Sequence, residues 1–169
     1  MFKRELANVL DAKGDLAGAC QVLMTIQYDN ETLEEKIEDY LTLSEFQFEL
    51  GDATAAEGYC NKVAHIINDS KNPESTKRYR MARVRLQDSK REFLHAAQGY
   101  YTLGINETDL DIANELLRLA LTCTILSPAG PRKARQLGIL HKEERLKSNQ
   151  YYELLAKMFN GEIVKQADV

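Results

Sequence analysis

The sequence has no tryptophan, only three cysteines and three prolines, and no long apolar run free of charge. Cys20, Cys60 and Cys123 are odd in number and widely spaced. This pattern excludes a disulfide framework and a zinc module of paired cysteines, and it fits a reducing compartment. A helix that crosses a bilayer needs about 18 mostly apolar residues, and the most apolar run, Leu116–Leu126, contains Arg118. The N-terminal MFKRELANVLDAKG lacks the apolar region of a secretory signal.

An excess of positive charge is also missing. The 169 residues carry 22 Lys and Arg against 26 Asp and Glu, a net charge of −4. Dedicated nucleic-acid-binding proteins usually carry net positive charge, so we expect no nucleic-acid partner, and the lack of an apolar span predicts no membrane partner. A hydrophobic content of 44% is enough for one domain or a short run of stacked repeats.

Strand signals are scarce, and the pattern predicts an all-α chain. No segment alternates β-branched or aromatic residues with polar ones, whereas Ala, Leu, Glu, Lys, Gln and Arg dominate. Thr32 with Glu35 forms a capping box, and Asn72 is a cap followed by Pro73 at the first helical position. Thr108 with Asp111 predicts a third helix start.

A repeated turn suggests stacked helix pairs. The segments LDAKGDLAGACQVL, FELGDATAAEGYCNKV and QDSKREFLHAAQGYYTL each end one helix and begin another, with a hydrophobic or small residue three before an alanine. The pairs are Leu16 with Ala19, Ala53 with Ala56, and Phe93 with Ala96, at spacings of 37 and 40 residues. These spacings are typical of helix-pair repeats of the tetratricopeptide and HEAT kind.

The segment 108–127 is apolar around most of a helix, with leucines, Ile125 and Cys123 on several faces. We therefore expect it to be buried between neighbouring helices, with Cys123 as a small buried hydrophobe. The resulting domain prediction is helical repeats over residues 1–104 and a C-terminal helical bundle over residues 105–169.

No catalytic, cofactor-binding or metal-binding pattern is present, so we predict a protein that is not an enzyme and has neither a cofactor nor a small-molecule substrate. His65, His95 and His141 lack partners at metal-ligand spacing, and there is no glycine-rich phosphate loop or GxSxG motif. The lack of known motifs does not exclude catalysis, so an enzyme with a small-molecule pocket that no sequence motif marks stays an alternative. The carboxylates of residues 34–39 are interpreted as a solvated helix face.

Charge is strongly segregated along the chain. Residues 5–58 hold thirteen acidic and two basic residues, a local charge of −11, whereas residues 71–91 hold eight basic and two acidic residues, a local charge of +6. A second basic run consists of Arg132, Lys133, Arg135, Lys142, Arg145 and Lys147. We expect Arg78, Arg80, Arg83 and Arg85 to contact an acidic partner. Internal ion pairs with residues 5–58, or a nucleic-acid module on this run, are the alternatives.

Three stretches carry a family resemblance. Lys90–Gly104 reads KREFLHAAQGYYTLG, Leu119–Leu146 reads LALTCTILSPAGPRKARQLGILHKEERL, and Ala56–Val63 reads AEGYCNKV. Together they resemble the subunit 4 family of the COP9 signalosome, over roughly Leu16 to Phe159. The CTIL segment, the Ala-Gly break and the Lys-Glu-Glu-Arg run are its most specific parts. The nearest alternative is the paralogous subunit of the 26S proteasome regulatory lid, followed by a generic helical-repeat adaptor.

The resemblance implies a PCI-class subunit, in which a right-handed superhelix of helix pairs leads into a helical bundle and a winged helix. No alternating strand pair follows Lys157, so we expect the winged helix to be absent, and MFKRELANVL enters a helix without a cap, so we expect a fragment. The resemblance also implies membership of the COP9 signalosome, the complex that removes Nedd8 from cullins through a different, metalloprotease subunit. The implied role is a cytoplasmic and nuclear scaffold whose partners are other signalosome subunits and a cullin-RING ligase.

Overall fold

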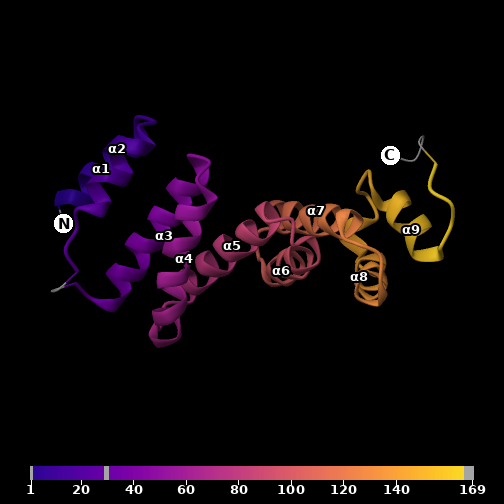
Figure 1. The fold of residues 1–169 in the computed structure, drawn as a ribbon. Coiled ribbons are helices and arrows are strands. Elements are labelled where there is room, and N and C mark those ends of the chain that lie inside the picture. The colour runs from indigo at the N-terminus through magenta and orange to yellow at the C-terminus, as the bar shows by residue number, and fades with distance from the viewer. Residues whose placement is uncertain (1, 29–30, 166–169) are drawn as a thin grey trace. The chain divides into compact units, whose positions relative to one another are not determined.

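The computed structural model describes residues 2–28 and 31–165, and every regular element within these ranges is helical (Figure 1). The all-α prediction is confirmed for this part of the chain. The α-helices are α1 (Phe2–Ala12), α2 (Leu16–Met24), α3 (Leu33–Glu49), α4 (Ala53–Ile66), α5 (Pro73–Ser89), α6 (Phe93–Asn106), α7 (Leu110–Leu126), α8 (Pro131–His141) and α9 (Tyr152–Asn160). Short 3₁₀ helices cover Ile67–Asp69 and Glu144–Leu146.

The helices pack as sequential pairs, α1 with α2, α3 with α4, α6 with α7, and α8 with α9. They form two compact units, Met1–Leu86 and Gln87–Val169, so that the boundary falls in the last turn of α5. Pairing of consecutive helices follows from the short connections between them, because a connection of a few residues returns the chain alongside the helix that it has just left.

The three turns singled out in the sequence share one backbone conformation. Gly14, Gly51 and Arg91 all have positive φ, at 80°, 85° and 60°. In each turn the amide of the following residue donates to a carbonyl five residues earlier: Asp15 to Leu10, Asp52 to Gln47, and Glu92 to Gln87, each at 2.9 Å. This is a Schellman-type helix end, which glycine adopts without strain and arginine does not.

The residue after each positive φ begins the next helix. Asp15 and Asp52 accept hydrogen bonds from the amides of Gly18 and Ala55, each at 2.9 Å, whereas the Glu92 side chain forms no capping bond. The third turn therefore keeps the geometry of the first two with less favourable residues at both positions.

The alanines of the repeated turn are fully buried. Ala19, Ala56 and Ala96 each have 0% of their surface exposed. In the first unit, Ala56 packs with Cys60, Ala82 and Leu86, with Phe48 and Tyr79 at the edge. Tyr79, Ala82 and Leu86 therefore form the inner face of α5, and they recur at the helical period.

The start of α7 differs from the sequence prediction. Its cap is Asp109, whose carboxylate accepts from the amides of Asp111 and Ile112, whereas the amide of Thr108 donates to Glu107. The predicted Thr108 cap is therefore wrong by one residue, because two aspartates and a threonine compete for the same amides.

The predicted burial of α7 is confirmed along most of the helix but not at its ends. Its buried residues are Ala113, Leu116, Leu117, Ala120, Leu121, Cys123 and Thr124, and Cys123 is 2% exposed as predicted. Leu110, Ile112 and Leu126 lie at the helix ends and are exposed. The helix is therefore apolar on more of its surface than its neighbours cover.

Candidate protein-interaction surface

Helix α3 uses its acidic residues to hold arginines from helices on either side of it in the chain. Glu35 and Asp39 contact Arg4 of α1, whereas Glu38 and Glu45 contact Arg78 of α5. Part of the negative charge in residues 5–58 is thus matched within the first unit by these two arginines. The predicted solvated face of residues 34–39 is wrong for Asp39, which is buried, whereas the side chains of Glu35 and Glu38 stay partly exposed beside their arginines.

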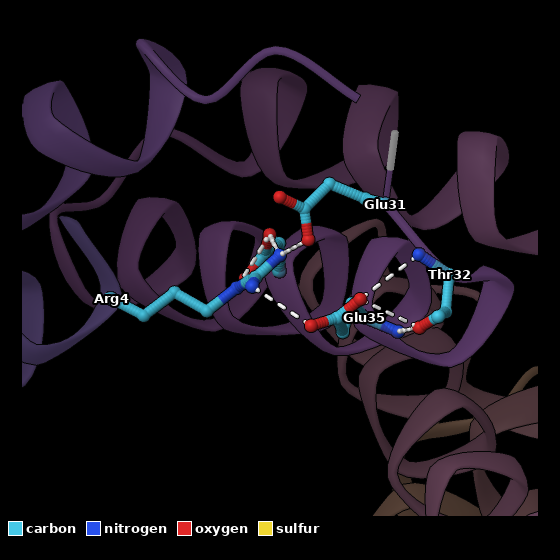
Figure 2. A network of polar contacts seen from close by, with 5 residues as sticks. Arg4, Glu31, Thr32 and Glu35 are labelled. Atoms are coloured by element: carbon cyan, nitrogen blue, oxygen red, sulfur yellow. Dashed lines mark hydrogen bonds and ion pairs between the residues drawn. The ribbon is translucent and has the colours of Figure 1, made fainter. Parts of the chain in front are cut away.

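Arg4 sits among three carboxylates (Figure 2). Its Nε donates to Asp39 Oδ1 at 2.9 Å, and its Nη2 donates to Asp39 Oδ2 at 2.9 Å and to Glu31 Oε2 at 2.7 Å. Nη1 lies 3.2 Å from Glu35 Oε1. The hydrogen bond to Asp39 is the main reason why the pKa of Arg4 is raised above its usual value.

The same region contains the predicted capping box. The amide of Thr32 donates to Glu35 Oε2 at 2.9 Å, and the amide of Glu35 donates to the Thr32 hydroxyl at 3.3 Å (Figure 2). The Glu35 carboxylate accepts the bond from the Thr32 amide and a second bond from the Thr32 hydroxyl, and these two bonds, chiefly the first, lower the pKa of Glu35. Glu35 therefore starts α3 with one carboxylate oxygen and binds Arg4 with the other.

Arg78 forms the corresponding contact from α5. Its Nη2 donates to Glu45 Oε2 at 2.7 Å, and its Nη1 donates to Glu38. Burial lowers the pKa of Arg78, but the bond to Glu45 and the surrounding carboxylates raise it more, so that the net pKa lies above the usual value. The buried Ser75 hydroxyl donates to Glu38 at 2.6 Å and fixes that carboxylate.

The structure separates the four arginines that the sequence placed in one partner surface. Arg78 is bound by α3, and the Arg85 guanidinium stacks over the Phe48 ring at 4.6 Å. Arg80 and Arg83 are exposed. The outward part of the predicted surface is therefore Arg80 and Arg83, which lie one turn apart.

The second basic run divides in the same way. Lys133 Nζ donates to the carbonyls of Ile125 and Ser127, each at 2.7 Å, and so caps the C-terminal end of α7. Arg145 binds Glu143 at 2.8 Å and Lys147 binds Glu144 at 2.6 Å. Of the remaining members, Arg132 and Arg135 are exposed on α8, and Lys142 is exposed at the C-cap of that helix.

Reactive side chains are dispersed in the described part of the chain. No group of three or more His, Cys, Asp or Glu residues that could hold a metal ion is found among residues 2–28 and 31–165. Cys20, Cys60 and Cys123 are buried thiols, and burial raises the pKa of each. None of the described helices is both long enough and apolar enough to cross a membrane.

Two polar contacts were not predicted from the sequence. One is the contact between Arg4 and Asp39. Its signals in the sequence were an arginine that precedes an acidic region and an aspartate that lies between the core residues Ile37 and Leu41. The other is Asp88, which accepts hydrogen bonds from the Tyr100 hydroxyl at 3.3 Å and the Cys123 thiol at 3.6 Å. Both join residues more than ten positions apart, which local patterns do not reveal.

Comparison with known proteins places these features in a family. The family model described as PSMD12/CSN4, N-terminal, matches residues 2–109. COP9 signalosome complex subunit 4 of Neurospora crassa is 31% identical over 179 residues, covering 100% of this chain and 40% of that protein. The subunit 4 proteins of Arabidopsis thaliana and Drosophila melanogaster are each 28% identical, covering 100% and 97% of this chain and 46% and 42% of their own lengths. The chain thus spans less than half the length of these relatives.

Proposed function

The chain belongs to the PSMD12/CSN4 N-terminal family, and from this premise we propose that it acts as a non-catalytic scaffold subunit of the COP9 signalosome. The observation that carries the proposal is identity of about 30% to COP9 signalosome subunit 4 along the whole chain. In this role the chain contributes to a complex that removes Nedd8 from cullins of cullin-RING ubiquitin ligases. Catalysis belongs to another subunit.

The helix pairs give this role a physical basis. Consecutive helix pairs with buried alanines at the turns are held by contacts between neighbours in the sequence, as in repeat proteins that bind partners. We propose that the pairs form a right-handed superhelix over residues 1–104 and that residues 105–169 begin a PCI-type helical bundle.

The partners in this proposal are other signalosome subunits and a cullin-RING ligase, in the cytoplasm and nucleus. Arg80 and Arg83 supply the contact, because Arg78 and Arg85 are engaged inside the first unit. An acidic surface on the partner would complement the two exposed guanidinium groups.

A second candidate is the equivalent subunit of the 26S proteasome regulatory lid. The family description joins PSMD12 with CSN4, which keeps this candidate open. A generic helical-repeat adaptor is the third possibility and needs neither complex.

Partner choice tests the proposal. The tagged chain is co-expressed with the remaining signalosome subunits or with the remaining lid subunits, and the recovered complexes are identified by native mass spectrometry. We expect one copy of the chain in a signalosome assembly and none in a lid assembly. Incorporation into the lid alone, or into neither complex, would overturn the assignment.

A further inference from the structure

We propose that the outward face of α8 docks an acidic, partly apolar segment of a partner protein. The face consists of Arg132, Arg135, Ile139 and Lys142, and it is called the α8 basic face below. It lies in the second unit, and the inference does not depend on which complex the chain joins.

The α8 basic face is continuous along the helix. Its residues are separated by three, four and three positions, which places them on one side at 3.6 residues per turn. All four are exposed, and Ile139 has 37% of its surface accessible. Leu137 and Leu140 are buried and fix the opposite side of α8 against the unit, and Gln136, which borders the face, is buried too. The basic face therefore points away from the core.

The cations of this face are uncompensated. Within the described ranges, Arg132, Arg135 and Lys142 form no ion pair, whereas Lys133, Arg145 and Lys147 of the same run are all engaged. Half of the basic run therefore forms contacts within the protein, and the other half is exposed on one surface.

The two arginines of the face also lie at positions that are unfavourable for the stability of α8. The first turn of α8 contains no acidic residue, and its cap, Gly130, offers no side-chain bond. Arg132 and Arg135 lie near the positive end of the helix dipole, where a cation is repelled. Helix stability therefore does not explain these arginines, and carboxylates brought by a partner would relieve the repulsion.

The chemistry of the face favours an acidic protein segment over a nucleic acid. Ile139 lies between the cations and can bury apolar surface against a leucine or similar side chain, a contact that a phosphate backbone does not offer. Three cations on an 11-residue helix and its C-cap in a chain of net charge −4 also provide little of the broad basic footprint that duplex binding uses. Glutamates or aspartates flanking an apolar residue match the face best.

The experiment uses the whole chain and a fluorescein-labelled helical peptide with leucine at every third or fourth position and glutamate elsewhere. Binding is measured by fluorescence anisotropy at about 50 mM salt, where charge attraction is weakly screened. We expect Arg132→Glu with Arg135→Glu to weaken binding about tenfold or more, and Ile139→Ser to weaken it about threefold. The neutral pair Arg132→Gln with Arg135→Gln should fall between the parent and the charge reversal.

The matched control is Lys13→Glu with Lys71→Glu, two exposed cations of the first unit that belong to neither proposed surface, and it should alter the affinity less than about twofold for the same change in charge. Folding is checked by thermal melting, where the Arg132→Glu, Arg135→Glu variant should melt at or above the parent temperature because acids favour a helix start. Failure of the parent to bind, an equal loss in the Lys13, Lys71 control, or tighter binding of a random DNA duplex than of the peptide would each overturn the proposal.

Discussion

Asp39 is 4% exposed and accepts two hydrogen bonds from one guanidinium, so its charge depends on Arg4 for compensation. Arg78 makes a comparable contact, in which carboxylates on one helix bind a donor from a helix distant in the sequence. Asp88 with Tyr100 and Cys123 repeats the arrangement in the second unit. Such contacts are few, but each one fixes a helix to its neighbours.

Removing Arg4 should be costly. Arg4→Met keeps much of the side-chain volume but leaves Asp39 buried without its partner, and breaking such a pair costs about 3 kcal/mol. We expect urea unfolding of the first unit to shift accordingly, with Lys13→Met as an exposed control that changes stability by less than about 0.5 kcal/mol. Equal stability of Arg4→Met and the parent would show that Asp39 is compensated elsewhere.

The Cys123 thiol should be unreactive and should make stability depend on pH. Burial raises its pKa from 9.0 to about 12, so the native state holds the proton more tightly than the unfolded state. The stabilisation is therefore complete below pH 9 and is lost as the pH rises toward 12. We expect Cys123→Ala to show a smaller fall in stability over this range than the parent.

Thiol alkylation at pH 8 provides the independent check. Native protein should label at Cys123 far more slowly than protein unfolded in guanidinium, because only the thiolate reacts. Rapid labelling of the native thiol would contradict its placement in the core.

At the scale of the element, the helix ends were the most predictable feature. Thr32 with Glu35 and Asn72 with Pro73 were identified because their bonds lie within a few residues, and the structure contains both. The Thr108 cap was misplaced because neighbouring Asp109 offers a better acceptor. Local sequence patterns did not predict the partners of Arg4 and Arg78, because these partners depend on how α3 packs against α1 and α5. Only the possibility of internal pairing could be stated.

The repeated turn predicts opposite effects at equivalent positions. Arg91→Gly should stabilise the protein by about 1 kcal/mol, because glycine adopts positive φ without the cost that a side chain pays. Gly51→Ala should destabilise it by about the same amount. Chemical denaturation measures both, and a destabilising Arg91→Gly would show that the Arg91 side chain contributes more than its strain costs.

The α5 arginines should separate in their effects on stability. Arg80→Glu with Arg83→Glu changes two exposed side chains, so the melting temperature should stay within about 3 °C of the parent. Arg78→Glu places a third carboxylate beside Glu38 and Glu45 and should lower the melting temperature by about 6 °C or more. A large fall in the double variant would instead make Arg80 and Arg83 part of an internal ion-pair network.

At the scale of the whole molecule, the two compact units are built by the same local rule, in which a helix returns along its predecessor through a short turn. Composition and the spacing of the turns predicted this rule, because it depends on contacts between neighbours in the sequence. The partner surfaces were less predictable, since each basic run supplies both structural and exposed cations. Only packing shows which arginines and lysines remain outside.

The assignment as a non-catalytic scaffold is tested most directly by a reconstituted deneddylation assay on a Nedd8–cullin conjugate. The chain alone, the remaining signalosome subunits alone, and the two combined are compared at equal concentrations. We expect no cleavage by the chain alone and faster cleavage when the chain is added to the other subunits. Cleavage by the isolated chain, or no effect of its addition on the rate, would contradict the assignment.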